Sequence, residues 1–191
     1  ADEAKAICAT EHFDLIHCHD WMTFKAGMIA KKILKKPLIV HVHSTEFDRT
    51  GGNGVNQAVY DLEREGMHAA DAIIAVSNYT KQLIIRHYAI PEHKVMVVHN
   101  AVEQRDSIPF KIDKDDKIIL FLGRLTLQKG PDYFLYAAKK VVELDPHVKF
   151  IIAGTGDMER FIIEKSAELG ISRNVLFAGF LQGDEVDRAY Q

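Results

Sequence analysis

Short apolar, β-branched runs alternate with segments of helical periodicity along the whole chain, and this alternation constrains the fold more than any other feature. Strands that alternate with helices are typical of βαβ units, which build parallel sheets. The sequence therefore predicts an α/β fold. The expected strands cover 14–19, 38–43, 72–76, 94–98, 117–122, 148–153 and 175–178.

The helical segments between these strands carry two specific expectations. In the first segment, apolar residues recur at helical spacing and indicate a helix; these residues are Met22, Ala26, Ile29 and Ile33. Ser77 follows the third expected strand and is a residue type that favours helix starts. We therefore expect Ser77 to cap a helix over 78–88.

A polar, glycine-rich loop over 44–54 joins the second expected strand to a helix that begins near Val55. Loops of this length are uncommon in compact domains, so we expect the loop to be functional or mobile. Its Phe47 would offer an aromatic platform to a hydroxyl-rich ligand. In the helix that follows, Glu63 and Glu65 are expected on a solvated face, without a catalytic role.

The most polar and least periodic part of the chain, 103–116, predicts a domain boundary. We place one domain at 1–105 and a second at 106–191. Neither half contains enough expected strands for a complete doubly wound sheet with helices on both faces.

Charge and composition exclude several classes of protein. The 191 residues include 24 Lys and Arg against 27 Asp and Glu, so the net charge of −3 lacks the basic excess of a general nucleic-acid binder. No apolar run approaches the roughly 18 residues of a membrane span, and the N-terminus lacks the order of a signal peptide. We therefore expect a cytoplasmic protein without integral membrane contact, in which Cys8 and Cys18 are reduced thiols in or near the core.

The segment Gly123-Arg124-Leu125-Thr126-Leu127-Gln128-Lys129-Gly130-Pro131 joins a strand to a helix. Ligands bind at the carboxyl ends of strands in open α/β sheets, where this turn is expected. The glycines permit close approach of the backbone, and the helix start offers free amides. With the charges of Arg124 and Lys129, the segment predicts an anion site suited to a diphosphate.

A second glycine turn, Ala153-Gly154-Thr155-Gly156-Asp157, also follows a strand and precedes a helix. It lacks the third glycine of the dinucleotide-binding fingerprint. Taken alone, it predicts a tight turn whose helix is capped by Asp157. Together, the two turns indicate a nucleotide crevice better than either does alone.

Two pairs of histidines, His17 with His19 and His41 with His43, stand at the ends of two expected strands. Residues two apart in a strand face the same side, so each pair could converge on one point. With nearby carboxylates, such pairs suit a zinc or two-metal hydrolase. Histidines hydrogen-bonded at a polar crevice edge are the alternative interpretation.

Taken in order, several motifs resemble those of the retaining glycosyltransferases of family 4, the group that includes glycogen and starch synthases. The motifs are His17-x-His19-Asp20-Trp21, Val76-Ser77 with Thr80-Lys81, His99-Asn100-Ala101-Val102, Gly123-Arg124-Leu125-x-x-Gln128-Lys129-Gly130 and Gly154-x-Gly156-Asp157. The family usually has glycine where this chain has Ala101.

The resemblance implies a GT-B fold, in which two Rossmann-like doubly wound domains face each other across a cleft. Both domains would be incomplete here, with 1–105 from the acceptor-side domain and 106–191 from the donor domain. We expect the chain to lack the family's N-terminal glycine-rich loop and its Glu-x7-Glu element. The parent enzyme is expected to build glycans, and the fragment alone to be inactive.

The resemblance also implies roles for individual residues. His19, Arg124 and Lys129 would be catalytic. Donor binding would involve Gly123, Arg124, Lys129, Gly130, Gly154 and Gly156. The acceptor side of the cleft would hold Asp20, Trp21, His43 and Asn100.

The implied reaction moves a sugar, expected to be glucose, from a nucleoside diphosphate sugar to a glycan or another hydroxyl acceptor. UDP- or ADP-glucose would be the co-substrate, with no metal and no other cofactor. Two alternatives stay open at this point: a metal-dependent hydrolase that uses the paired histidines, and a nucleotide-sugar-binding module without catalysis. No nucleic-acid partner is expected, and nothing in the sequence indicates an oligomeric state.

Overall fold

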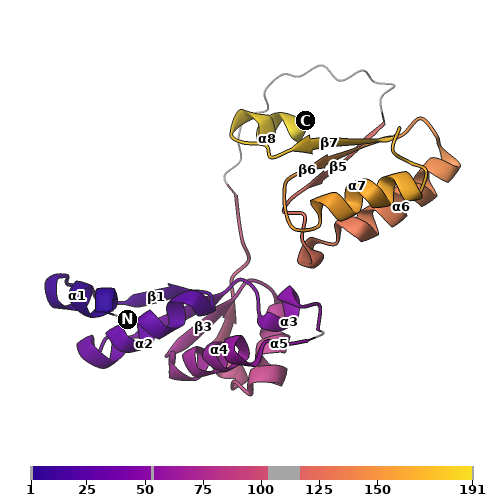
Figure 1. Ribbon diagram of the computed structural model, residues 1–191. Coiled ribbons are helices and arrows are strands. Elements are labelled where there is room, and N and C mark those ends of the chain that lie inside the picture. The colour runs from indigo at the N-terminus through magenta and orange to yellow at the C-terminus, as the bar shows by residue number, and fades with distance from the viewer. Residues whose placement is uncertain (1, 53, 103–116, 191) are drawn as a thin grey trace. The chain divides into compact units, whose positions relative to one another are not determined.

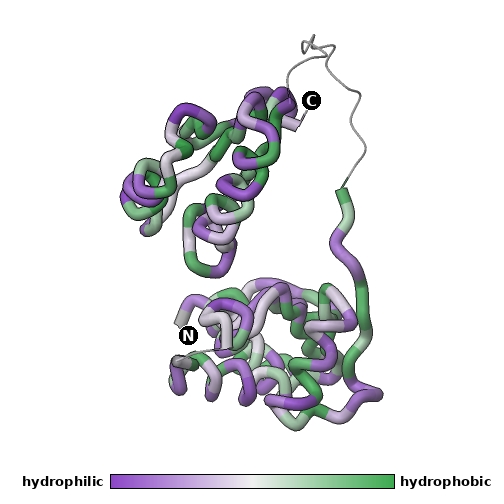
Figure 2. The backbone as a smooth tube through the Cα atoms, turned by 90° about the vertical axis from the view of Figure 1, so that its right-hand side faces the viewer, coloured by the Kyte–Doolittle hydropathy of each residue, from purple (hydrophilic) through white to green (hydrophobic). Residues whose placement is uncertain are grey.

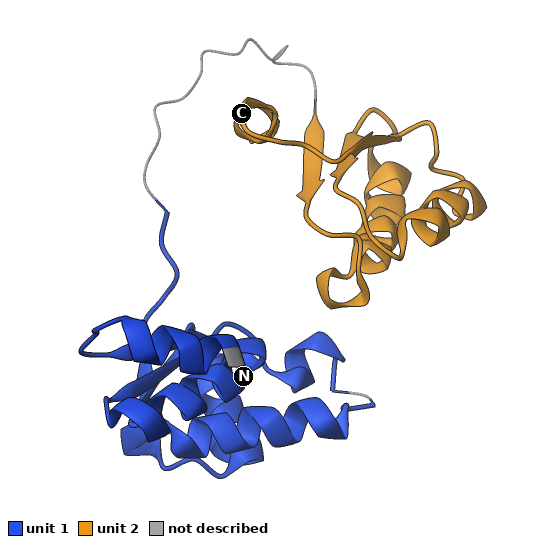
Figure 3. Cartoon of the chain, turned by 60° about the vertical axis from the view of Figure 1, so that its left-hand side comes forward, with its two compact units in different colours: residues 1–102 blue, residues 103–191 orange. Residues whose placement is uncertain are grey.

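The computed structural model describes residues 2–52, 54–102 and 117–190 (Figure 1). The chain divides into two compact units, unit 1 over residues 1–102 and unit 2 over residues 103–191 (Figure 3). The polar segment in which we expect the domain boundary, 103–116, lies outside the described residues. The division at 105/106 therefore stays a prediction.

Unit 1 is built on one parallel sheet, sheet A, whose strand order is β1-β2-β3-β4. Short strands alternate with helices as the sequence predicts. In chain order, the elements are α1 (Asp2–Thr10), β1 (Ile16–His19), α2 (Trp21–Leu34), β2 (Leu38–Val42), α3 (Glu46–Arg49), α4 (Gln57–Ala69), β3 (Ala72–Ala75), α5 (Asn78–Tyr88), the 3₁₀ turn η1 (Glu92–Lys94) and β4 (Val95–Val97).

The strand order of sheet A decides which of its faces the helices cover. Each strand pairs with the next one in sequence, and right-handed crossovers then place every connecting helix on the same face. Accordingly, Phe24 of α2, Met67 of α4 and Tyr88 of α5 belong to one buried core with Leu38 and Val40 of β2. One face of the sheet carries this core, and alternate side chains point to the other face.

Unit 2 repeats this plan with a smaller parallel sheet, sheet B, of order β5-β6-β7. Its core includes Leu125, Leu135, Phe150, Ile152 and Ile162. Helices α6 and α7 lie side by side (Figure 1). The elements are β5 (Ile118–Leu122), the 3₁₀ turn η2 (Leu127–Lys129), α6 (Pro131–Leu144), β6 (Lys149–Ala153), α7 (Glu159–Glu168), β7 (Val175–Gly179) and α8 (Asp184–Ala189). The predicted α/β fold with parallel sheets is confirmed.

The helix indicated by the apolar residues after β1 is present as α2, but those residues do not mark its buried face. Met22 is 73% exposed and Ile33 is 48% exposed, whereas Phe24 and Gly27 are buried against the sheet. The reason is steric: a Cβ on Gly27 would lie 2.2 Å from the Cys18 Sγ, so only glycine permits this close approach to β1. Figure 2 shows hydrophobic and hydrophilic segments alternating along the helices, and such spacing does not fix which side of a helix packs inward.

The expectation for Glu63 is also wrong, although Glu65 is exposed as predicted. Glu63 is only 1% exposed and accepts hydrogen bonds from the Arg49 guanidinium and the Tyr88 hydroxyl. Its Oε2 also accepts a hydrogen bond from the Glu46 backbone N–H at 3.1 Å. Because Arg49 lies beside it, the buried carboxylate is paired with an opposite charge.

This buried network fixes part of the segment expected to be a loop. Helix α3 forms within it and begins with a capping box between Thr45 and Asp48. The Glu46 carboxylate accepts a hydrogen bond from the Asn56 N–H at 3.1 Å, which fastens the far end of the segment. The loop therefore contains a short helix held by buried charges.

Three local expectations have clear outcomes. Ser77 caps α5 as predicted, since its Oγ accepts a hydrogen bond from the Thr80 N–H. Cys8 and Cys18 are free and buried, as expected. Asp157 does not cap α7. The N-cap residue of that helix is Met158, one position later, and no side chain caps the helix. In the described part of the chain, no helix is both long and apolar enough to cross a membrane.

Candidate functional site

The carboxyl edge of sheet A gathers four histidines. His19 of β1 lies opposite His41 of β2, so the alternation of side chains along each strand places both histidine pairs on the same face. Neighbouring ring centroids are 4.2 Å apart for His41 and His43 and 4.4 Å apart for His17 and His19. The two predicted pairs therefore form a single cluster, which we call the histidine cluster.

A direct contact joins the outermost members of the histidine cluster. His19 Nδ1 and His43 Nε2 are 2.9 Å apart, so one imidazole donates a hydrogen bond to the other. Both side chains are exposed. The contact fixes the orientation of the two rings relative to each other.

Asp20 fastens the end of β1 to the end of β2. Its Oδ1 accepts hydrogen bonds from the backbone N–H of His43 at 2.8 Å and of Ser44 at 3.4 Å. Asp20 has φ 55° and ψ 167°, a backbone conformation that is costly for any residue except glycine. Asp20 thus holds the backbone of His43 in place.

Burial and neighbouring charges lower the pKa values of His17 and His41. Burial lowers the pKa of His17, and the nearby His19 and His43 lower it further. Burial likewise lowers the pKa of His41, with the other three histidines acting in the same direction. Moreover, His41 Nε2 is buried and has no hydrogen-bond partner among the described residues.

The histidine cluster also satisfies a loose geometric criterion for metal binding. One ring nitrogen from each of His17, His19 and His41 lies within 4.8 Å of the others. Neutral imidazole is a good ligand for zinc and related ions. These three residues could therefore hold a transition-metal ion.

Trp21 and Asn100 are the other residues predicted on the acceptor side. Trp21, the first residue of α2, is half-buried and packs against the core of unit 1. Asn100 is exposed and follows β4. Just before it, His99 Nδ1 lies 3.1 Å from the Val76 carbonyl oxygen, which ties this segment to the end of β3.

In unit 2, the two glycine turns lie side by side at the carboxyl edge of sheet B. The Leu125 N–H donates to the Thr155 carbonyl oxygen at 2.9 Å, and the Met158 N–H donates to the Leu125 carbonyl oxygen at 2.9 Å. A Cβ on Gly154 would lie 1.9 Å from the Gly123 carbonyl oxygen, and one on Gly156 would lie 2.3 Å from that of Leu125. The glycines of the second turn thus permit the two turns to pack together.

A hollow of about 280 Å³ opens over these turns. Three residues predicted to bind the donor, Gly123, Arg124 and Gly154, line it. The lining also includes residues that the sequence analysis missed: Leu122, Ala153, Thr155, Phe180, Leu181 and Val186. A signal for Phe180 was available, because it follows β7 at the same edge of the sheet.

The remaining predicted donor residues do not line the hollow. Two of them lie just before α6, and the third packs against Leu125. Lys129 ends η2 with an exposed side chain, and Gly130 adopts φ 61° immediately before Pro131, the first residue of α6. The side chains of Arg124 and Lys129 form no hydrogen bond or ion pair with any described residue. Gly156 does not line the hollow, since it packs on the backbone of Leu125.

Two polar atoms beside this turn are buried without a hydrogen-bond partner among the described residues. They are Thr126 Oγ1 and Asp132 Oδ1. Thr126 lies inside the turn, and Asp132 is in the first turn of α6. Together with the free amides at the start of α6, they give this edge of sheet B unused hydrogen-bonding capacity.

Each of the two parts of the chain matches a glycosyltransferase family model. Residues 2–105 match the family model Glycosyltransferase Family 4, and residues 102–191 match Glycosyl transferases group 1. An uncharacterized glycosyltransferase of Methanocaldococcus jannaschii is 34% identical over 97% of this chain and 51% of its own length. The Escherichia coli UDP-Gal:alpha-D-GlcNAc-diphosphoundecaprenol alpha-1,3-galactosyltransferase is 28% identical over 89% of this chain and 48% of its own length.

Solved structures show the same fold. A sucrose-phosphate synthase from Thermosynechococcus elongatus matches with a TM-score of 0.81 at 17% identity, over 97% of this chain and 50% of that one. Anabaena HepE, in complex with UDP and glucose, matches with a TM-score of 0.75 at 20% identity, over 95% of this chain and 52% of that one. These neighbours are GT-B glycosyltransferases.

The chain spans about half the length of the curated relatives it matches. The matches cover both units, and each of the two family models describes glycosyltransferases. Both matches thus point to the same class of enzyme. The chain belongs to glycosyltransferase family 4.

Proposed function

We propose that the protein transfers a sugar from a nucleoside diphosphate sugar to a hydroxyl group of an acceptor, with retention of configuration. UDP- or ADP-glucose is the proposed donor, and a glycan is the proposed acceptor. The observation that carries the proposal is the hollow of unit 2, which is lined by Arg124 and by residues of the two packed glycine turns. The complex of Anabaena HepE with UDP and glucose supports a uridine nucleotide.

The donor would bind at the carboxyl edge of sheet B. The Arg124 guanidinium suits a phosphate because its planar fork can donate two parallel hydrogen bonds. Lys129 adds a point charge, and the free amides at the start of α6 favour an anion. As the bond to the sugar breaks, negative charge grows on the departing diphosphate, and these groups would stabilise it.

Binding of the sugar and the acceptor is assigned to unit 1. His19 would contact the transferred sugar through the ring edge that the His43 contact leaves free. Asp20 would act through His43, because it holds the His43 backbone. Trp21 and Asn100 are proposed to line the acceptor side. The reaction would need no metal and no cofactor, and the proposed location is the cytoplasm.

Nucleotide binding provides the first test. Calorimetric titration of the chain with UDP and with ADP should show binding of one or both. Arg124→Ala and Lys129→Ala should each weaken binding by at least about tenfold, because each removes a charge-assisted contact. Arg173→Ala, which removes an exposed charge elsewhere in unit 2, is the matched control. Equal affinities for all four proteins would contradict the proposed donor site.

Turnover provides the second test. Release of UDP or ADP from the glucose donor measures transfer, and the anomeric configuration of the product, read by NMR, tests retention. Because the fragment alone is expected to be inactive, turnover is measured on the full-length enzyme, in which nucleotide binding without release would favour the non-catalytic module. The metal-dependent hydrolase is kept as a second candidate on the geometry of His17, His19 and His41. Zinc that survives dialysis, together with hydrolysis that a chelator abolishes, would favour that candidate.

A further inference from the structure

The outward side of α2 carries side chains that sheet A and the neighbouring helices leave exposed or only partly cover. We call this the α2 surface, and it comprises the exposed Met22, Lys25, Lys32 and Ile33 and the half-buried Ile29. At about 100° per residue, these five positions fall within a sector of about 100° around the helix axis. Met22 is 73% exposed and Ile33 is 48% exposed. An apolar stripe with lysines along one flank thus faces outward.

The charge around the α2 surface differs from that of the rest of the chain. Between Trp21 and Lys36 there are five lysines and no acidic residue, whereas the whole chain has a net charge of −3. The lysines are Lys25, Lys31, Lys32, Lys35 and Lys36. Three of them, Lys25, Lys32 and Lys35, make no side-chain hydrogen bond or ion pair with any described residue. Their charges are therefore available to an external anion.

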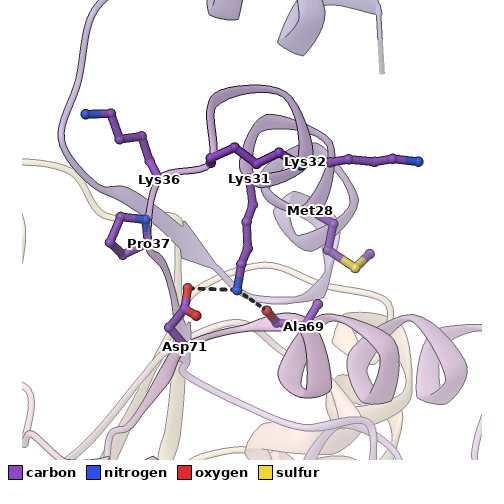
Figure 4. A pocket seen from close by; sticks show the side chains of 8 residues that line it. Met28, Lys31, Lys32, Lys36, Pro37, Ala69 and Asp71 are labelled. Atoms are coloured by element: carbon purple, nitrogen blue, oxygen red, sulfur yellow. Dashed lines mark hydrogen bonds and ion pairs between the residues drawn. The ribbon is translucent and has the colours of Figure 1, made fainter.

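Figure 4 shows how the lysines at the end of α2 are arranged. The Lys31 ammonium lies 2.8 Å from the Asp71 carboxylate and donates to the Ala69 carbonyl oxygen at 2.8 Å. Lys32 and Lys36 extend away from that ion pair. Together with Met28 and Pro37, these lysines line an open hollow of about 500 Å³. The basic region thus continues beyond the α2 surface.

The apolar stripe also continues, on the side of α2 that faces α1. A groove of about 190 Å³ there is lined by Ile7, Phe13 and Ala26, among other apolar residues. Ile7 is itself 53% exposed. Exposed aliphatic side chains of α1 and α2 therefore extend the apolar stripe on the side of α2 that faces away from the lysines.

The ordinary explanation for lysines in a last helical turn is interaction with the helix dipole. It accounts for Lys31 and Lys32, but not for Lys25 near the start of α2 or for the exposed Met22 and Ile33. Protein interfaces are enriched in aromatic residues and depleted in lysine, whereas the α2 surface has two lysines and no aromatic residue. A helix that lies on an anionic bilayer combines lysines with an outward apolar stripe.

From these observations, we infer that the α2 surface docks on an anionic lipid bilayer. Met22, Ile29 and Ile33 enter the boundary between headgroups and acyl chains, and Lys25, Lys32 and Lys35 bind the headgroup phosphates. This contact is peripheral. It does not depend on the proposed transferase reaction, so either can fail without the other.

Vesicle flotation of the 191-residue chain tests the inference. Vesicles of phosphatidylcholine that contain about one third phosphatidylglycerol, which gives them a negative surface potential, are compared with vesicles of phosphatidylcholine alone. The chain should float with the anionic vesicles only. Lys25→Gln/Lys32→Gln/Lys35→Gln should weaken binding by about a hundredfold, since each surface lysine contributes about fivefold. The matched control, Arg86→Gln/Lys140→Gln/Arg173→Gln, removes three exposed charges elsewhere and should bind like the wild type.

A second variant tests the apolar stripe separately. Met22→Ser/Ile33→Ser keeps every charge and should weaken binding by at least about tenfold. Thermal melts check that each variant folds, which we expect because both side chains are exposed. Failure of the wild type to float with anionic vesicles would overturn the inference, as would equal losses in the lysine variant and its control. Self-association that Met22→Ser/Ile33→Ser abolishes, without any vesicle binding, would assign the surface to a second copy of the chain.

Discussion

The Asp20 carboxylate accepts a hydrogen bond from the backbone N–H of His43 at 2.8 Å, across the ends of two neighbouring strands. It links the motif that follows β1 to the histidine that follows β2. Because Asp20 keeps a strained backbone to make this contact, the geometry of the histidine cluster depends on it.

Replacement of Asp20 by alanine should destabilise unit 1 by about 1–3 kcal/mol, because it leaves two backbone N–H groups without their acceptor while the strain remains. Asp20→Asn keeps an acceptor oxygen and should cost less than about 1 kcal/mol. Urea denaturation measures both changes. A loss as large for Asp20→Asn as for Asp20→Ala would show that charge, rather than the hydrogen bonds, is what matters.

The stability of unit 1 should fall as the pH drops below about 6.5. The pKa values of His17 and His41 are lowered in the folded state, so the unfolded chain binds protons first as the pH falls. Above that pH both states are neutral at these sites, and the histidines contribute no pH dependence. His41→Gln should flatten the stability profile measured between pH 5 and 7.5, whereas His147→Gln, an exposed change in unit 2, should leave it as it is.

Substitution of Glu63 by glutamine should destabilise the chain by about 1–3 kcal/mol, since it removes one of the two carboxylates paired with Arg49 and leaves Glu46 as the other. Glu65→Gln, on the exposed side of the same helix, should change stability by less than about 0.5 kcal/mol. Chemical denaturation of the two variants compares them directly. Similar values would mean that the buried network contributes little.

Gly154→Ala should destabilise unit 2 by at least about 3 kcal/mol, because the new Cβ would lie against the Gly123 carbonyl oxygen. Gly170→Ala separates this clash from backbone strain. Gly170 has φ 72° and nothing within 4 Å of an added Cβ, so its cost should be about 1 kcal/mol. If the two melts coincide, backbone strain alone explains the requirement for glycine at residue 154.

Phe180→Ala should weaken UDP binding by about tenfold, the scale of one lost stacking contact with a base. Phe180 lines the hollow over the glycine turns and is 65% exposed, so the fold should be unaffected. Phe161→Ala removes another exposed ring, on α7, and serves as the control in the same titration. Unchanged affinity in Phe180→Ala would place the base elsewhere.

Much of the fold follows from local sequence signals. The strand and helix alternation, the capping role of Ser77 and the turn at Gly130 depend on residues close together in the chain, so the sequence predicts them. The motifs around His19 and Arg124 also indicate the family, which the comparisons confirm. The roles proposed for these residues in catalysis stay predictions.

Tertiary structure alone decided the rest. The sequence presents α2 with apolar residues on two sides, and only the close packing of Gly27 on Cys18 selects the buried one. Glu63 resembles any surface glutamate until Arg49 and Tyr88, 14 and 25 residues away, surround its carboxylate. The four histidines form one cluster only because β1 pairs with β2 in a register that sets His19 beside His41. Each of these features depends on contacts between distant residues, and the energies of such contacts are not encoded in local periodicity.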